Sequence, residues 1–310
     1  MNELLFSVAS KVRDSLRPHL DQMLRTAVHD NIGDPHFTID DIAERALDAA
    51  LRDWPLRLAY FSEDRGLVKL SNDPDYILIV DPIDGTRSAM SGFESCCFSA
   101  AVAPFSESPT YADISHAIIM ELQSGDSYYA ARDIPGIMTP ARRPVKLGST
   151  QDIETMFWSL ELTAHPVNVL MSAYGHMVDA SVRRGAVFVF TSSSFSLTRI
   201  ITGQLDAHID IGHRLLNDDP SLLPQFEKVG GGCPTCLFPY DIAAAAFIAE
   251  KAGAVITDAY GKTLQALPLL TDKSMGGQLS LVAAANKNLH QNILKNIYFH
   301  SDKKGVLCAH

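Results

Sequence analysis

The sequence predicts an α/β protein, because segments with helical periodicity and short apolar strands are both present along the chain. Apolar residues recur at helical spacing over residues 3 to about 29, which is typical of an amphipathic helix. Residues 76–80 are all apolar or aromatic, as in a strand buried on both faces. Residues 117–122 and 127–131 flank Gly125-Asp126, a pattern that predicts a β-hairpin.

The remaining elements follow from the same signals. We expect a turn at residues 31–35, a helix over 42–47, a strand over 98–102, a helix over 175–183, a strand over 186–190, a helix over 195–203, and an alanine-rich helix after Tyr240 that leads to a turn and strand by 258. A boundary near residues 148–151 would divide the chain into a domain of residues 1–148 and a domain of residues 149–310.

Composition limits the classes of function. The chain has 310 residues, enough for one large or two medium domains, with 46% hydrophobic and 20% charged residues, as in an ordinary globular protein. Its net charge of −10 argues against a nucleic-acid polymer as the main partner. No apolar run has the length of a membrane span and the first residues do not form a signal peptide, so we expect a cytoplasmic protein with no membrane partner.

The strand at residues 76–80 runs directly into two acids and a helix start. Asp81 ends the apolar run, Asp84 follows three residues later, Gly85 permits a turn or a close backbone approach, and Thr86 can cap the next helix. This combination suits a divalent cation and a phosphate held side by side. Asp-Pro and Asp-Gly pairs also occur in ordinary turns, which is the alternative for the motif in isolation.

The string Asp-Pro-Ile-Asp-Gly-Thr at residues 81–86, placed after an apolar strand, resembles the signature of the inositol monophosphatase superfamily of magnesium-dependent, lithium-sensitive phosphatases. Matching motifs extend from about Thr38 to Asp258. The resemblance implies a layered α-β-α-β-α sandwich with two sheets, α+β in the first half and α/β in the second. It also implies a homodimer and a small-molecule phosphate monoester as substrate.

The resemblance also implies a set of metal ligands and catalytic groups. Two or three Mg²⁺ ions would be held by Glu63, Asp81, the Ile83 carbonyl, Asp84 and Asp241. All-oxygen ligation suits Mg²⁺, and paired ions can clamp a phosphate and activate water. Thr86 would orient the attacking water together with Glu63, and the N–H groups of Gly85 and Thr86 would bind the phosphate.

Two of these assignments have plain structural alternatives in the first half of the chain. Asp41, in Thr38-x-x-Asp41, corresponds to the residue that orients the catalytic threonine, and the same spacing is a helix capping box. Relatives have Gly-Glu-Glu where this chain has Ser62-Glu63-Asp64. Glu63 keeps the chemistry of a ligand, although both acids could instead be solvated loop residues beside Arg65.

The substrate-binding residues implied by the resemblance lie in the second half. Ser192 and Ser193 fall on a substrate loop in which relatives have glycine and alanine, and Asp210 falls on a substrate-binding acid. A helix cap is the alternative for the serines. Asp241 follows Tyr240 where relatives have Trp-Asp, and an acid favoured by the helix dipole is its alternative role.

A long segment, residues 214–239, replaces a few residues in relatives. It would be an active-site lid, an oligomer contact or a passive surface loop. It contains Cys233-Pro-Thr-Cys236, a spacing found in zinc and redox sites and also in plain loops; no second ligand pair has suitable spacing nearby.

The sequence therefore favours a Mg²⁺-dependent phosphomonoesterase acting on an inositol phosphate or a sugar phosphate. Fructose-1,6-bisphosphatase and 3′-phosphoadenosine nucleotide phosphatase share the metal motifs and are the enzymatic alternatives. The altered residues at 62–64 and 191–194 leave open a metal-dependent binding or regulatory protein without turnover.

Overall fold

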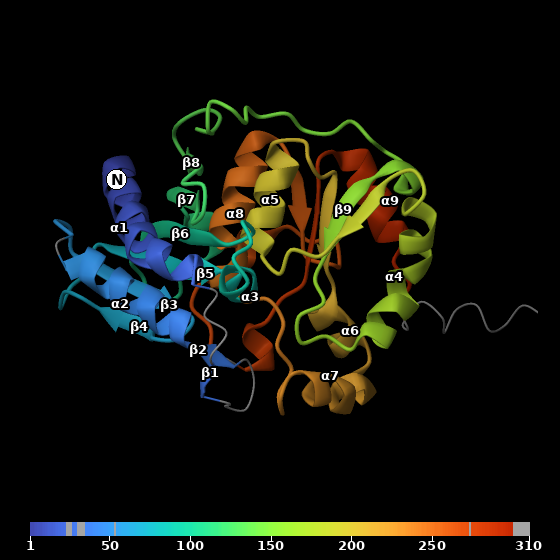
Figure 1. Ribbon diagram of the computed structural model, residues 1–310, viewed down its shortest axis with the longest axis horizontal. Helices are drawn as coiled ribbons and strands as arrows, with labels where there is room; N and C mark the ends of the chain where they lie inside the picture. Colours follow the sequence, from blue (N-terminus) through green and yellow to red (C-terminus); the bar gives the residue numbers. More distant parts are fainter. Residues whose placement is uncertain (23–26, 30–34, 53, 273, 300–310) are drawn as a thin grey trace, which may run out of the picture.

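The computed structural model describes residues 1–22, 27–29, 35–52, 54–272 and 274–299. In this part of the chain, helices and sheets alternate in the order helix, sheet, helix, sheet, helix (Figure 1). The expected layered α-β-α-β-α sandwich with two sheets is confirmed. No described helix combines the length and the apolar character that crossing a membrane requires.

The first sheet has six strands in the order β4-β3-β5-β6-β7-β8. β3 and β5 are parallel and the other neighbours are antiparallel. The strands β6, β7 and β8 confirm the expected strand and hairpin, and Gly125 makes the hairpin turn at φ +76°. The bounds are β3 Leu58–Ser62, β4 Gly66–Lys69, β5 Tyr76–Asp84, β6 Cys97–Pro104, β7 His116–Glu121 and β8 Ser127–Ala131.

Two helices, α1 Asn2–Leu20 and α2 Thr38–Arg52, cover the outer face of this sheet (Figure 1). Their apolar faces pack on side chains of β3, β5, β6 and β7. The first helix is shorter than expected, with its C-cap at Asp21. Residues 27–29, which were expected to be helical, form β1 Ala27–His29 and pair with β2 His36–Phe37. Pairing with β2 thus outweighs helical periodicity at residues 27–29. Of the expected turn at 31–35, residues 31–34 lie outside the described residues.

The second sheet has five strands in the order β10-β9-β11-β13-β12. β10, β9 and β11 are parallel, and β13 runs antiparallel to both β11 and β12. The strand expected over 186–190 is shorter than predicted. The bounds are β9 Phe157–Leu160, β10 Ala186–Phe188, β11 Ala207–Asp210, β12 Val255–Thr257 and β13 Leu281–Ala284.

Helices α5 Ser193–Ile201 and α8 Pro239–Ala252 form the central layer between the sheets (Figure 1). Alanines make up much of α8, and their small side chains let it pack closely against β5, β6 and β7. Over the other face of the second sheet lie α4 Val167–Ser181 and α9 Lys287–Asn296 (Figure 1). Below the end of this sheet lie α6 Gly212–Asp218 and α7 Leu223–Val229, which share its core (Figure 1). The helix expected over 175–183 is the second half of α4. The segment 214–239 thus contains most of α6 and all of α7, whose Phe226 is part of the core.

Candidate active site

The two acids of the central motif lie at the end of β5, where the strand becomes irregular. The pairing of β5 with β6 shifts register between Asp81 and Asp84. Asp81 is 5% exposed and Asp84 8% exposed, yet both line one cavity. The Ile83 N–H donates to Asp81 Oδ1 at 2.9 Å, and the cavity also reaches Ile83. The irregularity therefore turns consecutive motif residues toward a common space.

Gly85 is required by the geometry of the turn that follows. It precedes α3 Thr86–Met90 at φ +92°, a conformation that side chains disfavour. A Cβ at this position would lie 2.4 Å from the Ser95 carbonyl oxygen. The close approach of the two backbone segments brings Gly85 and Thr86 to the wall of the cavity.

The hydroxyl of Thr86 is held by Asp40, not by Asp41 as the sequence predicts. Thr86 Oγ1 donates to Asp40 Oδ1 at 2.9 Å. Asp40 Oδ2 accepts the Phe37 N–H at 2.8 Å, so Asp40 also caps α2. Asp41 instead pairs with His36 at 3.0 Å. The helix starts at Thr38 because Phe37 is still in β2, which moves the capping pattern back by one residue.

Glu63 follows β3 and lines the same cavity. Its neighbour Asp64 pairs with His36 Nδ1 at 3.3 Å, so His36 bridges the start of α2 and the loop that carries Glu63. Ser62 is fully buried at the end of β3. Glu63 and Asp64 thus have different environments, although they are adjacent in sequence.

Asp241 reaches the cavity from α8, in the central layer. Its Oδ2 accepts the Phe238 N–H at 2.6 Å, which makes it a helix-capping acid. This is the structural alternative considered for Asp241, and its place in the cavity wall is compatible with a second role. Sheet, loop and helix therefore each contribute a carboxylate.

Burial and mutual repulsion dominate the electrostatics of these acids. The pKa of Asp81 is raised well above its usual value, first by burial and then by Asp84, Asp241 and Glu63. Burial raises the pKa of Asp84 to about 6, although hydrogen bonds from Ser192 and Ser194 oppose the shift. Such a cluster needs a neutralising cation to remain fully ionised at neutral pH.

The donor set fits a hard divalent cation. Carboxylate and carbonyl oxygens are the ligands that Mg²⁺ and Ca²⁺ prefer. The imidazole that lines the cavity, that of His165, pairs with Asp210. Within the described residues, no three His, Cys, Asp or Glu side chains stand in a ready-made metal-ligand group. The fit therefore rests on the shared cavity and on the repulsion among the carboxylates.

The serine loop before α5 holds Asp84 in place. Ser192 Oγ donates to Asp84 Oδ2 at 2.8 Å and accepts the Phe195 N–H at 3.1 Å, so it is also the helix cap. The Ser194 N–H donates to the same carboxylate oxygen at 2.7 Å. Ser193 lines the cavity, and its hydroxyl lies 3.2 Å from His208 Nε2.

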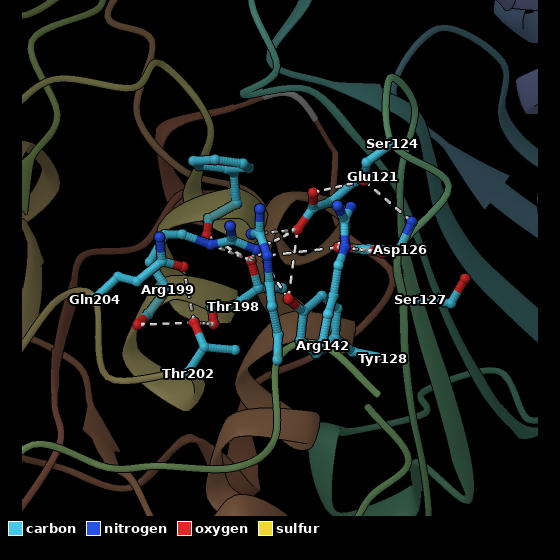
Figure 2. Close-up of polar contacts among 12 residues, drawn as sticks. Glu121, Ser124, Asp126, Ser127, Tyr128, Arg142, Thr198, Arg199, Thr202 and Gln204 are labelled. Carbon is cyan, nitrogen blue, oxygen red and sulfur yellow. Dashed lines mark hydrogen bonds and ion pairs between the residues drawn. The ribbon is translucent and has the colours of Figure 1, made fainter. Parts of the chain in front are cut away.

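A buried ion pair anchors α5 at a distance from this loop. Arg199 of α5 bonds Glu121 at the end of β7, and both side chains are almost fully buried. Arg199 also donates to the Tyr128 hydroxyl at 2.9 Å (Figure 2). Arg142 pairs nearby with Asp126 at 2.8 Å (Figure 2). The contacts of Arg199 fix α5 of the central layer to the first sheet, and α5 begins at the serines that bond Asp84.

The remaining wall of the cavity comes largely from residues that sequence reasoning missed. Glu161, Thr163 and His165, which were not predicted, follow β9, and the predicted Asp210 ends the neighbouring parallel strand β11. Ends of parallel strands meet at one edge of a sheet. The short, mostly apolar run at residues 157–160 was therefore the signal that could have placed the residues after it in the site. The rest of this wall is Thr235, Cys236, Leu237 and Phe238, all from the segment 214–239.

The cavity has a volume of about 120 Å³, which is ample for several water molecules since one needs ~10–15 Å³ on this measure. Its acidic lining residues are Glu63, Asp81, Asp84, Glu161, Asp210 and Asp241. Among the described lining residues, Arg87 and His165 are those that can carry positive charge. Cys233 and Cys236 are unbonded thiols, and the latter lies beside His165.

Comparison with known proteins agrees with this geometry. A model of the inositol monophosphatase family matches residues 2–302. The chain is 24% identical over 273 residues to a fructose-1,6-bisphosphatase/inositol-1-monophosphatase of Methanothermobacter thermautotrophicus, covering 86% of this chain and 84% of that protein. It is 23% identical to a bifunctional NADP phosphatase/NAD kinase of Methanocaldococcus jannaschii, where 93% of this chain spans 50% of the relative.

Solved structures show the same fold at lower identity. The extragenic suppressor protein suhB of Bartonella henselae superposes with a TM-score of 0.70 at 17% identity, covering 95% of this chain and 96% of that one. An IMPase of Thermotoga maritima gives a TM-score of 0.67 at 18% identity, with 95% and 96% covered. The match of the family model over nearly the whole chain, with this fold and this cavity, shows that the chain belongs to the inositol monophosphatase family.

Proposed function

We propose that this protein is a Mg²⁺-dependent phosphatase that hydrolyses the monophosphate ester of an inositol or a sugar. Membership of the family makes it a phosphoric monoester hydrolase, which sets aside the alternative of a protein without turnover. The observation that carries the rest is the shared cavity: Glu63, Asp81, Asp84 and Asp241 line the same space as Thr86 and Asp210.

We propose that two or three Mg²⁺ ions are held by Glu63, Asp81, the Ile83 carbonyl, Asp84 and Asp241. Bound there, divalent cations would neutralise the carboxylates, activate a water and polarise the phosphate. Ser192 and Ser194 hold the Asp84 carboxylate in a fixed orientation, which limits the reorganisation needed for binding.

Thr86 and Asp40 have a directional role in this proposal. The single hydroxyl proton of Thr86 is donated to Asp40, so its oxygen can accept a hydrogen bond from the attacking water. Glu63 would share in orienting that water. The N–H groups of Gly85 and Thr86, at the wall of the cavity, would donate to the phosphate oxygens, and Ser193 and Asp210 would contact the alcohol.

Charge favours a substrate with one phosphate. A second phosphate would add negative charge to a lining with six acidic residues, whereas the described lining residues that can carry positive charge are Arg87 and His165, of which His165 pairs with Asp210. Fructose 1,6-bisphosphate is the second candidate, because relatives named for that activity match most of the chain. A homodimer and a cytoplasmic location complete the proposal, and both follow from the resemblance and the sequence.

The experiment is a phosphate-release assay on metal-stripped protein with and without Mg²⁺. Inositol 1-phosphate, fructose 1,6-bisphosphate and 3′-phosphoadenosine 5′-phosphate form the substrate panel. We expect Mg²⁺-dependent turnover that is fastest with inositol 1-phosphate or another sugar monophosphate. Asp84→Asn should lose more than ~100-fold in kcat/KM, about 3 kcal/mol.

Asp14→Asn is the matched control, because the Asp14 side chain is 73% exposed on α1 and should leave activity unchanged. Absence of turnover with every phosphomonoester in the presence of Mg²⁺ would refute the proposal. Faster hydrolysis of either bisphosphorylated compound would replace the proposed substrate class.

A further inference from the structure

Two residues that line the cavity each have a buried polar atom without a hydrogen-bond partner. These atoms are His165 Nε2 and Asp210 Oδ2. His165 is 4% exposed and Asp210 2% exposed. His165 Nε2 lies 3.5 Å from the other oxygen of Asp210, Oδ1, close enough for an ion pair and too far for a good hydrogen bond. Buried polar atoms without partners cost about 1–3 kcal/mol each, so a group that completes them is expected.

The ring of His165 is held from several sides. Its Nδ1 contacts the Thr163 carbonyl oxygen, and since a carbonyl cannot donate, Nδ1 carries the proton. Phe226 packs edge-on against the ring at 5.8 Å between centroids, with an interplanar angle of 73°. Gly212 leaves room for it, because a Cβ there would lie 1.9 Å from His165 Nε2. The imidazole is therefore fixed with Nε2 toward Asp210.

The pairing keeps Asp210 charged despite its burial. Burial alone would raise the pKa of Asp210, but His165 and the Gly212 N–H, which donates at 3.1 Å, bring the pKa below its usual value. Burial alone would lower the pKa of His165, and Asp210 raises it well above the usual value. Asp210 thus has a buried carboxylate oxygen, Oδ2, that lacks a donor and can accept a hydrogen bond.

We propose that His165 is a positioning residue that aims Asp210 Oδ2 at a hydroxyl group of the leaving alcohol, and that the segment 214–239 is the wall that supports it. This inference rests on the proposed phosphatase function. It adds to that function a residue, His165, through which the free hydroxyls of the alcohol would be recognised. A carboxylate recognises such groups because it accepts hydrogen bonds and cannot donate them.

The proposal also assigns a role to the segment 214–239. Phe226 of α7 lies behind His165, while Thr235, Cys236, Leu237 and Phe238 line the cavity directly. Phe226 is fully buried in the core of the second half. The segment is thus built into the packed structure next to the substrate wall, which is neither a detached lid nor a passive loop.

The test compares two esters with the same ring, inositol 1-phosphate and cyclohexyl phosphate, which lacks the free hydroxyls. His165→Asn keeps an amide near Nδ1 and removes the Nε2 position, whereas His165→Gln places an amide near Nε2. For His165→Asn we expect KM for inositol 1-phosphate to rise about 10-fold, the value of one hydrogen bond, with kcat within about twofold. KM for cyclohexyl phosphate, or its inhibition constant if turnover is slow, should stay within about twofold.

His165→Gln should recover most of the preference for inositol 1-phosphate. Phe226→Leu, like His165→Asn, should lower the preference for inositol 1-phosphate over cyclohexyl phosphate. If His165→Asn does not fold, Phe226→Leu and His165→Gln together provide the test. Equal losses with both esters, or an unchanged preference in His165→Asn, would overturn the role of His165. An unchanged preference in Phe226→Leu would overturn the role of the segment.

The two proposals can fail separately. If the wild-type protein hydrolyses neither ester, nor any other phosphomonoester, in Mg²⁺, the proposed phosphatase function is wrong and this inference falls with it. If the wild-type protein hydrolyses inositol 1-phosphate without preferring it over cyclohexyl phosphate, the phosphatase function stands and this inference is wrong.

Discussion

Replacement of Asp40 by asparagine should reverse the hydrogen bonding of Thr86. Asp40 uses one oxygen for the Thr86 hydroxyl at 2.9 Å and the other for the Phe37 N–H at 2.8 Å. Asparagine has a single acceptor oxygen. If that oxygen keeps the Phe37 N–H, its NH₂ group faces Thr86 and donates to it. The Thr86 hydroxyl would then donate its proton to the Ile83 carbonyl oxygen, 3.2 Å away. The lone pair of Thr86 Oγ1 that should accept a hydrogen bond from water would instead accept one from the asparagine NH₂ group.

The size of the effect follows from the lost bond. A hydrogen bond to a charged group contributes about 1.5–3 kcal/mol, so we expect kcat to fall roughly 10- to 150-fold. Stability should change by less than about 1 kcal/mol, because the cap on Phe37 is retained. The measurements are kcat at saturating inositol 1-phosphate with Mg²⁺ and the midpoint of thermal unfolding.

Asp41→Asn is the control, one residue away. The Asp41 side chain is 48% exposed and pairs with His36, and exposed pairs contribute little. Its kcat should stay within about twofold of wild type. If Asp41→Asn loses as much activity as expected for Asp40→Asn, and Asp40→Asn is near normal, then the assignment of the threonine partner is wrong.

Three other predictions concern backbone space, buried charge and metal. Gly85→Ala should destabilise the fold by about 2 kcal/mol or more, through a positive φ and contact with the Ser95 carbonyl, and a near-normal urea midpoint would contradict this. Glu121→Gln should lower the free energy of unfolding by about 3 kcal/mol or more, because Arg199 is left buried without its counter-charge. The double variant Glu121→Gln with Arg199→Met should recover part of this loss, and additive losses of the two single variants would argue against coupling. In metal-free protein the pKa of Asp84 is raised to about 6, so the folded state binds more protons than the unfolded state between about pH 4 and 6. The free energy of unfolding should therefore fall by up to ~3 kcal/mol as the pH rises through that window. Added Mg²⁺ should oppose the fall in chemical denaturation, and a metal-independent profile would contradict the metal site.

Sequence reasoning worked best where chemistry is contained in a local string. The acids at 81 and 84, Gly85 and Thr86 lie together in sequence and around one cavity in space. Their strand is recognisable because it is buried on both faces and therefore continuously apolar. The layered fold followed from the same motifs and is confirmed.

Long-range pairing explains what the sequence could not supply. The sequence Thr38-x-x-Asp41 has the spacing of a capping box, yet the observed cap joins the Phe37 N–H to Asp40. Which acid caps the helix depends on where β2 ends, and β2 pairs with β1. His165 carried no local signal, because its role arises from neighbours on β11 and α7. Contacts of this kind are set by tertiary packing and leave no periodicity in the chain.

The position of Phe226 separates two tasks within one protein. The carboxylates that would serve the chemistry come from β5, the loop after β3 and the start of α8. The ring that packs against His165 comes from α7, in the segment 214–239. Under the proposed function, substitutions on α7 would alter which alcohol is accepted while the groups around the phosphorus atom stay as they are, so selectivity would change separately from turnover.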